Sequence, residues 1–329
     1  MTAQRGSFII SLDFELWWGV RDSKTQDTYG TNVKNVKNVI PALLNLFKKY
    51  NIRATFATVG FLFLREKEDF LRMLPAKVPN YTNSRLSPYH DHFTFLAEPF
   101  DTDEYYYGAS LLDTIRRHPE QEIASHTFSH YYCLEDGQTL EDFQEDLQMA
   151  QSVAQSDGLI LTSLVFPRNQ FNDAYLSVCT ALGFTCVRGN EKSWIYQVKN
   201  SDHTNYPRKI LKLLDSYVNL SGHNCYSISD VTRAVPVNLP ASRFLRPYSK
   251  KLRFLEPLKI TRIKNSMTHA AKNNLVFHLW WHPHNFGTNL KNNMASLEQL
   301  LQHYAFLKEK YHFCSETMSH ITSRILNEN

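Results

Sequence analysis

Short apolar segments rich in β-branched and aromatic residues alternate along this chain with longer segments of helical periodicity. The first segment, SFIISLDFE from Ser7 to Glu15, predicts a buried strand. Residues 32–50 predict a helix, because apolar side chains recur there at helical spacing, at Val33, Val36, Val39, Leu43, Leu46 and Phe47. The same patterns predict further strands at 54–60, 122–125, 163–168, 184–188 and 275–281, and further helices at 109–118, 139–155, 173–182 and 296–311.

This alternation of strands and helices predicts a parallel sheet whose strands are joined by right-handed crossovers. The length of 329 residues suits one barrel-sized domain, and we predict a single domain over 1–329. Two stretches interrupt the alternation. Residues 65–108 are irregular and contain several prolines, and residues 190–272 are weakly patterned. Both stretches are predicted to be insertions.

Polar side chains cluster at the points where the predicted strands end. In a parallel barrel, the active-site groups lie at the carboxyl ends of the strands and on the loops that follow them. The side chains found at these points are Asp13, Glu15, His126, His130, Arg168 and His282. Their shared position is the strongest positional indication of an active site.

Two pairs among these residues indicate a metal site. Asp13 and Glu15 are two residues apart on one strand, so both carboxylates leave the same face, and burying them is costly unless a cation lies between them. His126 and His130, in SHTFSH, are four residues apart and can reach one metal ion from a single turn. Two imidazoles and a carboxylate form a three-ligand site that leaves positions open for water. Each pair alone also has an ordinary explanation, an exposed strand end or a chance spacing.

A cation and a group of histidines end two other strands. Arg168, in VFPRNQ, keeps its charge and can hold a carboxylate ionised, although most loop arginines are simply exposed. The segment FHLWWHPHNFG places His278 inside a strand, His282 at its end and His284 just beyond. We expect His278 to be a core residue. Because imidazoles in general titrate near neutral pH, the histidine at the rim, His282, is the candidate general acid.

In their order along the chain, the segments SLDFE, HTFSH, FPRNQ and FHLWWHPHNF resemble the motifs of the polysaccharide deacetylase family, which includes chitin, peptidoglycan and nodulation-factor deacetylases. The second motif fits the family pattern position by position at His126 and His130. The sequence departs from the pattern at three points. The adjacent Asp-Asp pair is spaced by one residue in SLDFE, the arginine motif lacks its Pro-Tyr tail, and the motif with Asp and Trp has only Trp194 as a loose candidate.

The resemblance implies an irregular (β/α)7-type parallel barrel and a metal-dependent deacetylase that removes acetyl from an acetamido sugar. It implies one divalent metal ion, expected to be zinc, held by Glu15, His126 and His130. Asp13 would be the base, Arg168 the group that orients it, and His282 the acid that protonates the departing amine. A base must be free of the metal and Glu reaches further than Asp, which supports this division, although the sequence leaves open which of the two carboxylates is the base. The candidate substrate-binding residues are Trp194, His284 and Asn169.

Composition and charge limit the kinds of partner and the cellular compartment that we expect. The net charge of +4 is mild and gives no reason to expect a nucleic-acid partner. The five cysteines are odd in number and contain no CxxC pair, which is typical of a reducing compartment. The first residues contain no secretory signal pattern, and no segment approaches the length of a membrane span. We therefore expect a cytoplasmic protein. The sequence does not indicate its oligomeric state.

The stretch 241–272 is strongly basic, with a single acid, Glu256, and apolar residues threaded between the cations. The simplest interpretation is a solvated face around a few core anchors. The functional interpretation is contact with the phosphates of a nucleotide- or lipid-linked acetamido sugar, or at most a peripheral contact with an anionic membrane surface. It suggests a role in the assembly of O-antigen, capsule or a similar cell-surface polysaccharide.

Two alternative functions remain open. The first is a related amidohydrolase on the same barrel that cleaves another small C–N bond, such as a formamide or a cyclic ureide. The second is a carbohydrate-binding family member that has lost catalysis, although the six intact polar residues at the strand ends argue against it. The sequence contains no GxxxxGK, GxGxxG or GxSxG motif in the required context, so nucleotide hydrolysis, dinucleotide redox chemistry and serine hydrolysis are poorly supported.

Overall fold

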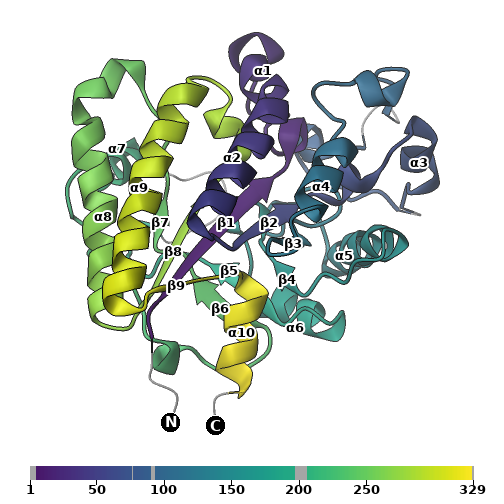
Figure 1. Cartoon of the computed structure of the whole chain (residues 1–329). Helices are drawn as coiled ribbons and strands as arrows, with labels where there is room; N and C mark the ends of the chain where they lie inside the picture. Colours follow the sequence, from purple (N-terminus) through teal and green to yellow (C-terminus); the bar gives the residue numbers. More distant parts are fainter. Residues whose placement is uncertain (1–4, 76, 90–92, 197–205, 328–329) are drawn as a thin grey trace.

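A sheet of parallel strands forms the centre of the computed structural model, which describes residues 5–75, 77–89, 93–196 and 206–327 (Figure 1). The strands follow the order β6-β5-β4-β3-β2-β1-β8-β7, and β9 pairs with the first part of β1. Their bounds are β1 (Ser7–Phe14), β2 (Ala54–Thr58), β3 (Glu122–Ser125), β4 (Ser163–Leu164), β5 (Cys186–Gly189), β6 (Val237–Pro240), β7 (Arg243–Phe244), β8 (Val276–Trp281) and β9 (Cys314–Glu316).

The two ends of this strand order are joined by the chain itself. β6 pairs with β5 and β7 pairs with β8, and only Ala241 and Ser242 separate β6 from β7. The Ala241 N–H donates to the carbonyl of Gly189 on β5 (2.9 Å), whereas the Ser242 N–H donates to the carbonyl of His278 on β8 (2.8 Å). One continuous stretch therefore bridges the two edges and closes the barrel. The predicted irregular (β/α)7-type parallel barrel is confirmed.

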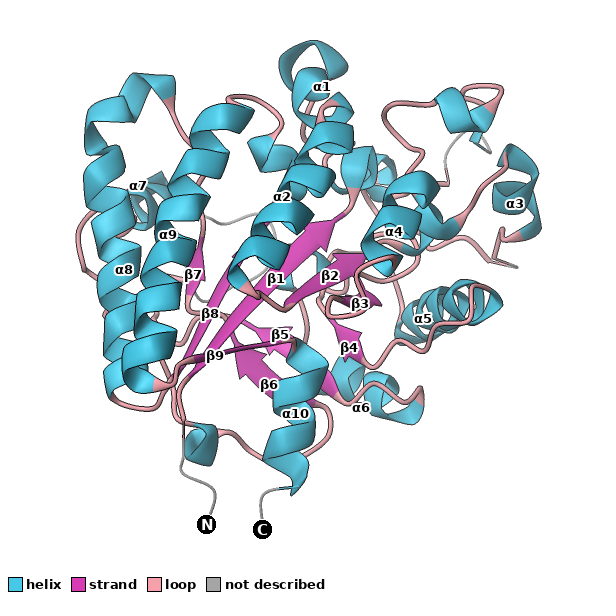
Figure 2. Cartoon of the chain, in the orientation of Figure 1, coloured by secondary structure: helices cyan, strands magenta, loops and turns pink. Residues whose placement is uncertain are grey.

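Helices cover the outside of the barrel, as Figure 2 shows. The helix α2 illustrates why they pack there, since its buried positions, Val36, Val39, Ile40, Leu43, Leu44 and Phe47, form a single apolar stripe. The helices are α1 (Gln26–Lys34), α2 (Val36–Tyr50), α3 (Lys67–Arg72), α4 (Ala109–Arg116), α5 (Leu140–Ser156), α6 (Asp173–Ala181), α7 (Tyr206–Leu214), α8 (Glu256–Lys272), α9 (Leu290–Tyr311) and α10 (Met318–Asn327).

Three differences from the predicted elements bear on the site and on the barrel. The predicted helix 32–50 is interrupted at Asn35, which separates α1 from α2. The predicted strand 163–168 ends at Leu164, because Pro167 has no N–H for a strand partner and Arg168 takes a positive φ of 54°. The stretch 190–272, predicted as an insertion, supplies β6, β7 and α8, so from residue 237 onward it is part of the barrel.

No helix in the described part of the chain is long and apolar enough to cross a membrane.

Candidate functional site

Three of the predicted residues meet at the carboxyl ends of the strands. Glu15 directly follows β1, and His126 and His130 follow β3. One ligand atom from each of the three buried side chains lies within 4.8 Å of the other two. The Glu15 Oε2 atom is 3.2 Å from His126 Nε2 and 3.0 Å from His130 Nε2. This cluster is the candidate metal site.

The turn that carries the two histidines is held by Asp146, a buried residue of α5. Its carboxylate accepts backbone hydrogen bonds from Phe128 N (2.7 Å) and Ser129 N (3.1 Å). Burial raises the pKa of Asp146 to about 6. Thr127 and His130 have positive φ angles of 62° and 58°, a conformation that these fixed hydrogen bonds help to hold. Sequence reasoning missed Asp146, whose only signal was an acid on the buried face of the helix.

The orientation of His126 and the neutral form of His130 suit a metal. The Nδ1–H of His126 donates to the carbonyl of Val165 (2.8 Å), so Nε2 is the nitrogen that faces Glu15. A metal-binding histidine is typically held by such a bond from its other nitrogen. Burial lowers the pKa of His130 to about 4, so its imidazole is neutral at physiological pH. The donor set therefore fits a divalent ion of the zinc type.

Asp13 is held by Arg188, not by Arg168 as predicted. The guanidinium of Arg188 donates to both carboxylate oxygens, with Nη1–Oδ1 at 2.5 Å and Nη2–Oδ2 at 2.8 Å. Burial alone would raise the pKa of Asp13, but the guanidinium outweighs it and keeps this pKa below its ordinary value. Arg188 also donates to Ser11 Oγ (3.0 Å) and lies over the ring of Trp280 (4.3 Å). Arg188 is thus the orienting cation that sequence reasoning missed.

Arg168 forms a separate network beside the site. It pairs with Asp22 and with Glu135, where the Nη1–Oε1 distance is 2.7 Å. Its guanidinium also lies over the ring of Tyr132, 4.2 Å from the centroid. The turn of positive φ at Arg168 directs the side chain to these acids rather than to Asp13. Its contact with the site is indirect, because the Tyr132 ring packs against His130 with centroids 5.1 Å apart.

The late histidines occupy three different positions. His282 Nε2 is 3.6 Å from Asp13 Oδ2 and 3.6 Å from Glu15 Oε1, and its side chain is 23% exposed. His284 is buried and stacks on His282, with its Nε2 3.8 Å from Glu15 Oε1. His278 is a core residue within β8, where its Nε2 is hydrogen-bonded to Ser11 Oγ (2.8 Å). His282 is therefore the imidazole that reaches both the carboxylates and solvent.

The structure separates the three candidate substrate-binding residues. His284 lies within the site, and the Asn169 Oδ1 accepts a hydrogen bond from Arg188 Nη2 (3.1 Å). Trp194 lies in a turn after β5 and is 58% exposed, with no hydrogen bond or ring contact to the site among the described residues. The tryptophan that borders the site is Trp280, whose ring is 5.7 Å from that of His282.

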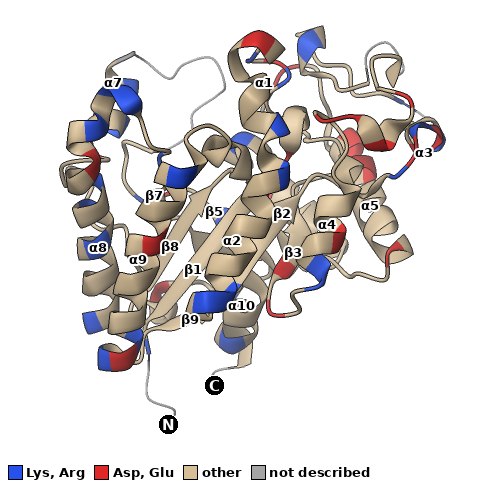
Figure 3. Cartoon of the chain, turned by 45° about the horizontal axis from the view of Figure 1, so that its top comes forward, with Lys and Arg blue, Asp and Glu red and all other residues tan. Residues whose placement is uncertain are grey.

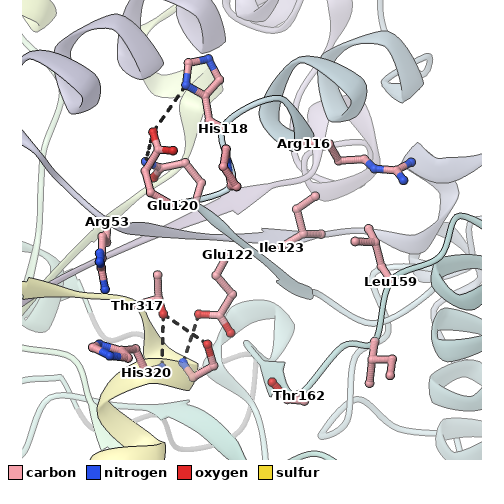
Figure 4. A pocket seen from close by; sticks show the side chains of 14 residues that line it. Arg53, Arg116, His118, Glu120, Glu122, Ile123, Leu159, Thr162, Thr317 and His320 are labelled. Carbon is pink, nitrogen blue, oxygen red and sulfur yellow. Dashed lines mark hydrogen bonds and ion pairs between the residues drawn. The ribbon is translucent and has the colours of Figure 1, made fainter.

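A pocket of about 690 Å³ lies at the opposite end of the barrel (Figure 4). Arg53, Gln121 and Thr162 in its lining directly precede β2, β3 and β4. Its two acids already have partners within the protein. Glu120 lies 3.5 Å from His118 and accepts from Gln121 Nε2 (3.3 Å). Glu122 accepts from Thr55 Oγ1 (2.7 Å) and from Ser319 N (3.1 Å). These acids thus stabilise the amino ends of the strands, at the end of the barrel opposite the candidate metal site.

Comparisons with known proteins agree with this fold. Residues 26–187, about half of the chain, match the family model of polysaccharide deacetylase. This region includes His126, His130 and Arg168, whereas Asp13 and Glu15 precede it and His282 follows it. A search of curated proteins gave no match.

Two solved structures share the fold. A protein from Mycobacterium smegmatis assigned to the polysaccharide deacetylases has a TM-score of 0.59 at 13% identity, over 99% of this chain and 92% of that one. A protein from Pseudomonas aeruginosa PAO1 with the same assignment has a TM-score of 0.53 at 11% identity, over 97% of this chain and 89% of that one. With the family match and the order of the motifs, the chain belongs to the polysaccharide deacetylase family.

Proposed function

We propose that this chain is a metal-dependent N-deacetylase that removes the acetyl group from an acetamido sugar. The observation that carries the proposal is the buried cluster of Glu15, His126 and His130 beside a carboxylate, Asp13, that is held ionised by Arg188. A three-ligand site of this type leaves positions for water and for a carbonyl oxygen. The family assignment and the barrel support the same reaction.

The residues divide the work between binding the ion and moving protons. Glu15, His126 and His130 would hold one divalent ion, for which zinc is the expected choice, and such an ion polarises an amide carbonyl and acidifies water. Asp13 accepts the proton of the attacking water, because Arg188 keeps this carboxylate charged and fixed in one orientation. His282, which is partly exposed at the rim, donates a proton to the amine that leaves. His284 packs behind His282 and restricts its ring.

The sequence also suggests how the substrate is carried and where the protein acts. The basic stretch 241–272 would suit an acetamido sugar carried on a nucleotide or a lipid, as in O-antigen or capsule assembly, and a cytoplasmic location suits such activated sugars. The second candidate is hydrolysis of another small C–N bond, which would use the same ion and the same base. The partial exposure of His282 favours a substrate that enters from outside the barrel, as a sugar chain or a carried sugar does.

A substrate panel tests the proposed function. The purified protein, loaded with Zn²⁺ and separately with Co²⁺, is incubated with N-acetylglucosamine oligomers, a UDP-linked N-acetyl sugar, a polyprenyl-diphosphate-linked N-acetyl sugar, and small formamides and cyclic ureides. We expect acetate release from at least one acetamido sugar, abolished by chelation. Turnover of only the small amides would replace the deacetylase by an amidohydrolase, and inactivity on the whole panel despite stoichiometric metal would favour a binding function.

Replacing each arginine in turn by lysine is expected to distinguish the role of Arg188 from that of Arg168. We predict that Arg188→Lys lowers deacetylation by about 100-fold, because lysine cannot hold both oxygens of Asp13 and a small displacement of a catalytic group costs about this much. Arg168→Lys, the matched control, is expected to lower it less than about tenfold, since Arg168 contacts Asp22 and Glu135 instead. Steady-state rates and thermal unfolding of both variants provide the comparison. A larger loss in Arg168→Lys would return the orienting role to Arg168.

A further inference from the structure

The helix α7 turns its apolar side toward solvent. Ile210, Leu213 and Leu214 lie at i, i+3 and i+4 on one face and are 43%, 37% and 47% exposed. Arg208 and Lys212, on the opposite side of the helix, are half-buried. A surface helix of a globular protein ordinarily turns its apolar face inward. The apolar face of α7 therefore calls for a partner outside the barrel.

A second exposed segment combines apolar and basic residues in the same way. The 3-10 helix Lys250–Leu255 and the first turn of α8 expose Phe254 (72%) and Leu258 (50%). Lys250, Lys251 and Arg253 of this segment are exposed beside them. Neither α7 nor the 3-10 helix contains an acidic residue. The acid in the first turn of α8, Glu256, is buried and pairs with Lys259 (2.7 Å). Both segments thus offer exposed apolar side chains together with exposed cations.

Contacts below the surface link the chain just after α7 to the start of α8 through Arg246. Arg246 Nε lies 2.7 Å from Ser216 Oγ, and Lys259 Nζ of α8 donates to the Arg246 carbonyl (3.0 Å). Figure 3 shows the cations of α7 and α8 on the left side of the molecule. We name the apolar groups of Ile210, Leu213, Leu214, Phe254 and Leu258, with the cations Lys209, Lys250, Lys251 and Arg253, the basic apolar surface.

We propose that the basic apolar surface binds the face of an anionic lipid bilayer. An interfacial helix places its apolar side among the acyl chains while Lys and Arg contact the lipid phosphates, and this surface supplies both kinds of group. The core of a protein–protein interface, in contrast, is depleted of lysine. Exposed apolar residues elsewhere in the described chain, such as Leu71 and Ile160, lie among charges of both signs. The helix of Leu71 contains two acids, and Ile160 borders a pocket that is lined by Glu120 and Glu122 as well as by arginines.

Part of the basic apolar surface leaves the barrel at the same end as the candidate metal site. The 3-10 helix Lys250–Leu255 follows β7, so it leaves the barrel at the carboxyl ends of the strands, where the candidate metal site lies. Docking on a bilayer would therefore hold that end of the barrel near membrane-borne molecules. The proposal itself does not depend on deacetylation, because vesicle binding needs neither a bound ion nor turnover.

Vesicle flotation tests the proposal with matched variants. The protein is mixed with vesicles of phosphatidylcholine alone or with added phosphatidylglycerol, at low and at high salt. We expect binding only to the anionic vesicles and weaker binding at high salt. Leu214→Glu with Phe254→Glu is expected to weaken partition at least about tenfold, because two apolar anchors are replaced by anions. Lys250→Gln with Lys251→Gln should weaken it about fivefold or more for each lost cation at low salt.

The control pair removes apolar groups of similar exposure far from this surface. Leu71→Glu with Ile160→Glu replaces side chains that are 49% and 78% exposed, close to the 47% and 72% of Leu214 and Phe254. We expect this pair to bind vesicles like the unaltered protein. Failure of the unaltered protein to float with anionic vesicles, or equal loss in both pairs, would overturn the proposal. Self-association that Leu214→Glu with Phe254→Glu abolishes, without any flotation, would overturn it in favour of a second copy of the chain.

Discussion

Replacing His126 and His130 together by alanine is expected to remove the bound divalent ion and to lower deacetylation by roughly 10³-fold. The variant deletes two of the three buried donors and leaves only the Glu15 carboxylate. A metal ion contributes several kcal/mol to the stabilisation of the transition state, and each 1.36 kcal/mol corresponds to about tenfold in rate. Metal analysis of the purified proteins, before and after Zn²⁺ soaking, is the measurement. About one ion per chain in both proteins would disprove the assignment.

A glycine offers an independent way to disturb the same site without removing a ligand. A Cβ on Gly19 would stand 1.9–2.4 Å from the carboxylate atoms of Glu15, so Gly19→Ala must displace this carboxylate. The neighbour that moves is the end of a side chain, so we expect the fold to survive. Metal affinity is expected to fall by about 10–100-fold, as it does when the support of a ligand is lost. Unchanged affinity in Gly19→Ala would mean that Glu15 is not a ligand.

The second large effect is expected for Asp13→Asn, which should lower deacetylation by about 10³-fold while the metal content stays unchanged. The amide cannot accept the proton of water, but the three proposed ligands remain in place. Because Arg188 then loses its charged partner in a buried place, the free energy of unfolding is also expected to fall by about 3 kcal/mol. Rates, metal content and chemical denaturation are measured on the same preparation.

Asp215→Asn is the matched control for this stability effect. Asp215 is a buried carboxylate paired with a buried arginine, Arg243, at 2.7 Å, and neither residue contacts the candidate metal ligands. We expect a similar loss of stability with activity within about twofold of the unaltered protein. If both variants lost activity equally, the loss in Asp13→Asn would come from the fold rather than from a missing base. If Asp13→Asn lost the ion, Asp13 would be a ligand.

Sequence patterns identified much of the barrel, because strands such as β1, β2 and β5 are buried along their whole length and helices such as α2 carry one apolar stripe. They missed β6 and β7, the short strands that close it. They failed where the backbone leaves regular geometry. The strand predicted to Arg168 ends at Leu164, and the positive φ at Arg168 then turns this side chain toward Asp22 and Glu135. Nothing in the letters VFPRNQ specifies that turn. The predicted partner of Asp13 was therefore wrong, although the need for a cation was correct.

Arg188 could in principle have been found from side-chain alternation along the strands. Cys186 and Arg188 lie on the same face of β5, as Ser11 and Asp13 do on β1. A charged residue in the interior of a strand is costly unless a partner of opposite charge meets it there. That partner, Asp13, lies on β1, 175 residues away in the sequence, and only the barrel brings the two side chains together. Sequence periodicity shows which side chains share one face of a strand, but it does not show which strands meet across the barrel.

The way the barrel closes has a consequence for how activity would return after unfolding. β1 carries Asp13 and leads to Glu15, β8 leads to His282, and the register pairs Ser7 with Val276. Contacts between residues so far apart along the chain form slowly, because a long loop must be ordered before they stabilise anything. Helical signal during refolding should therefore recover before metal binding does. The ion would report the moment at which β1 and β3, which lead to its proposed ligands, have come together. Activity, which also needs the proposed acid His282 after β8, would return only when the ring has closed.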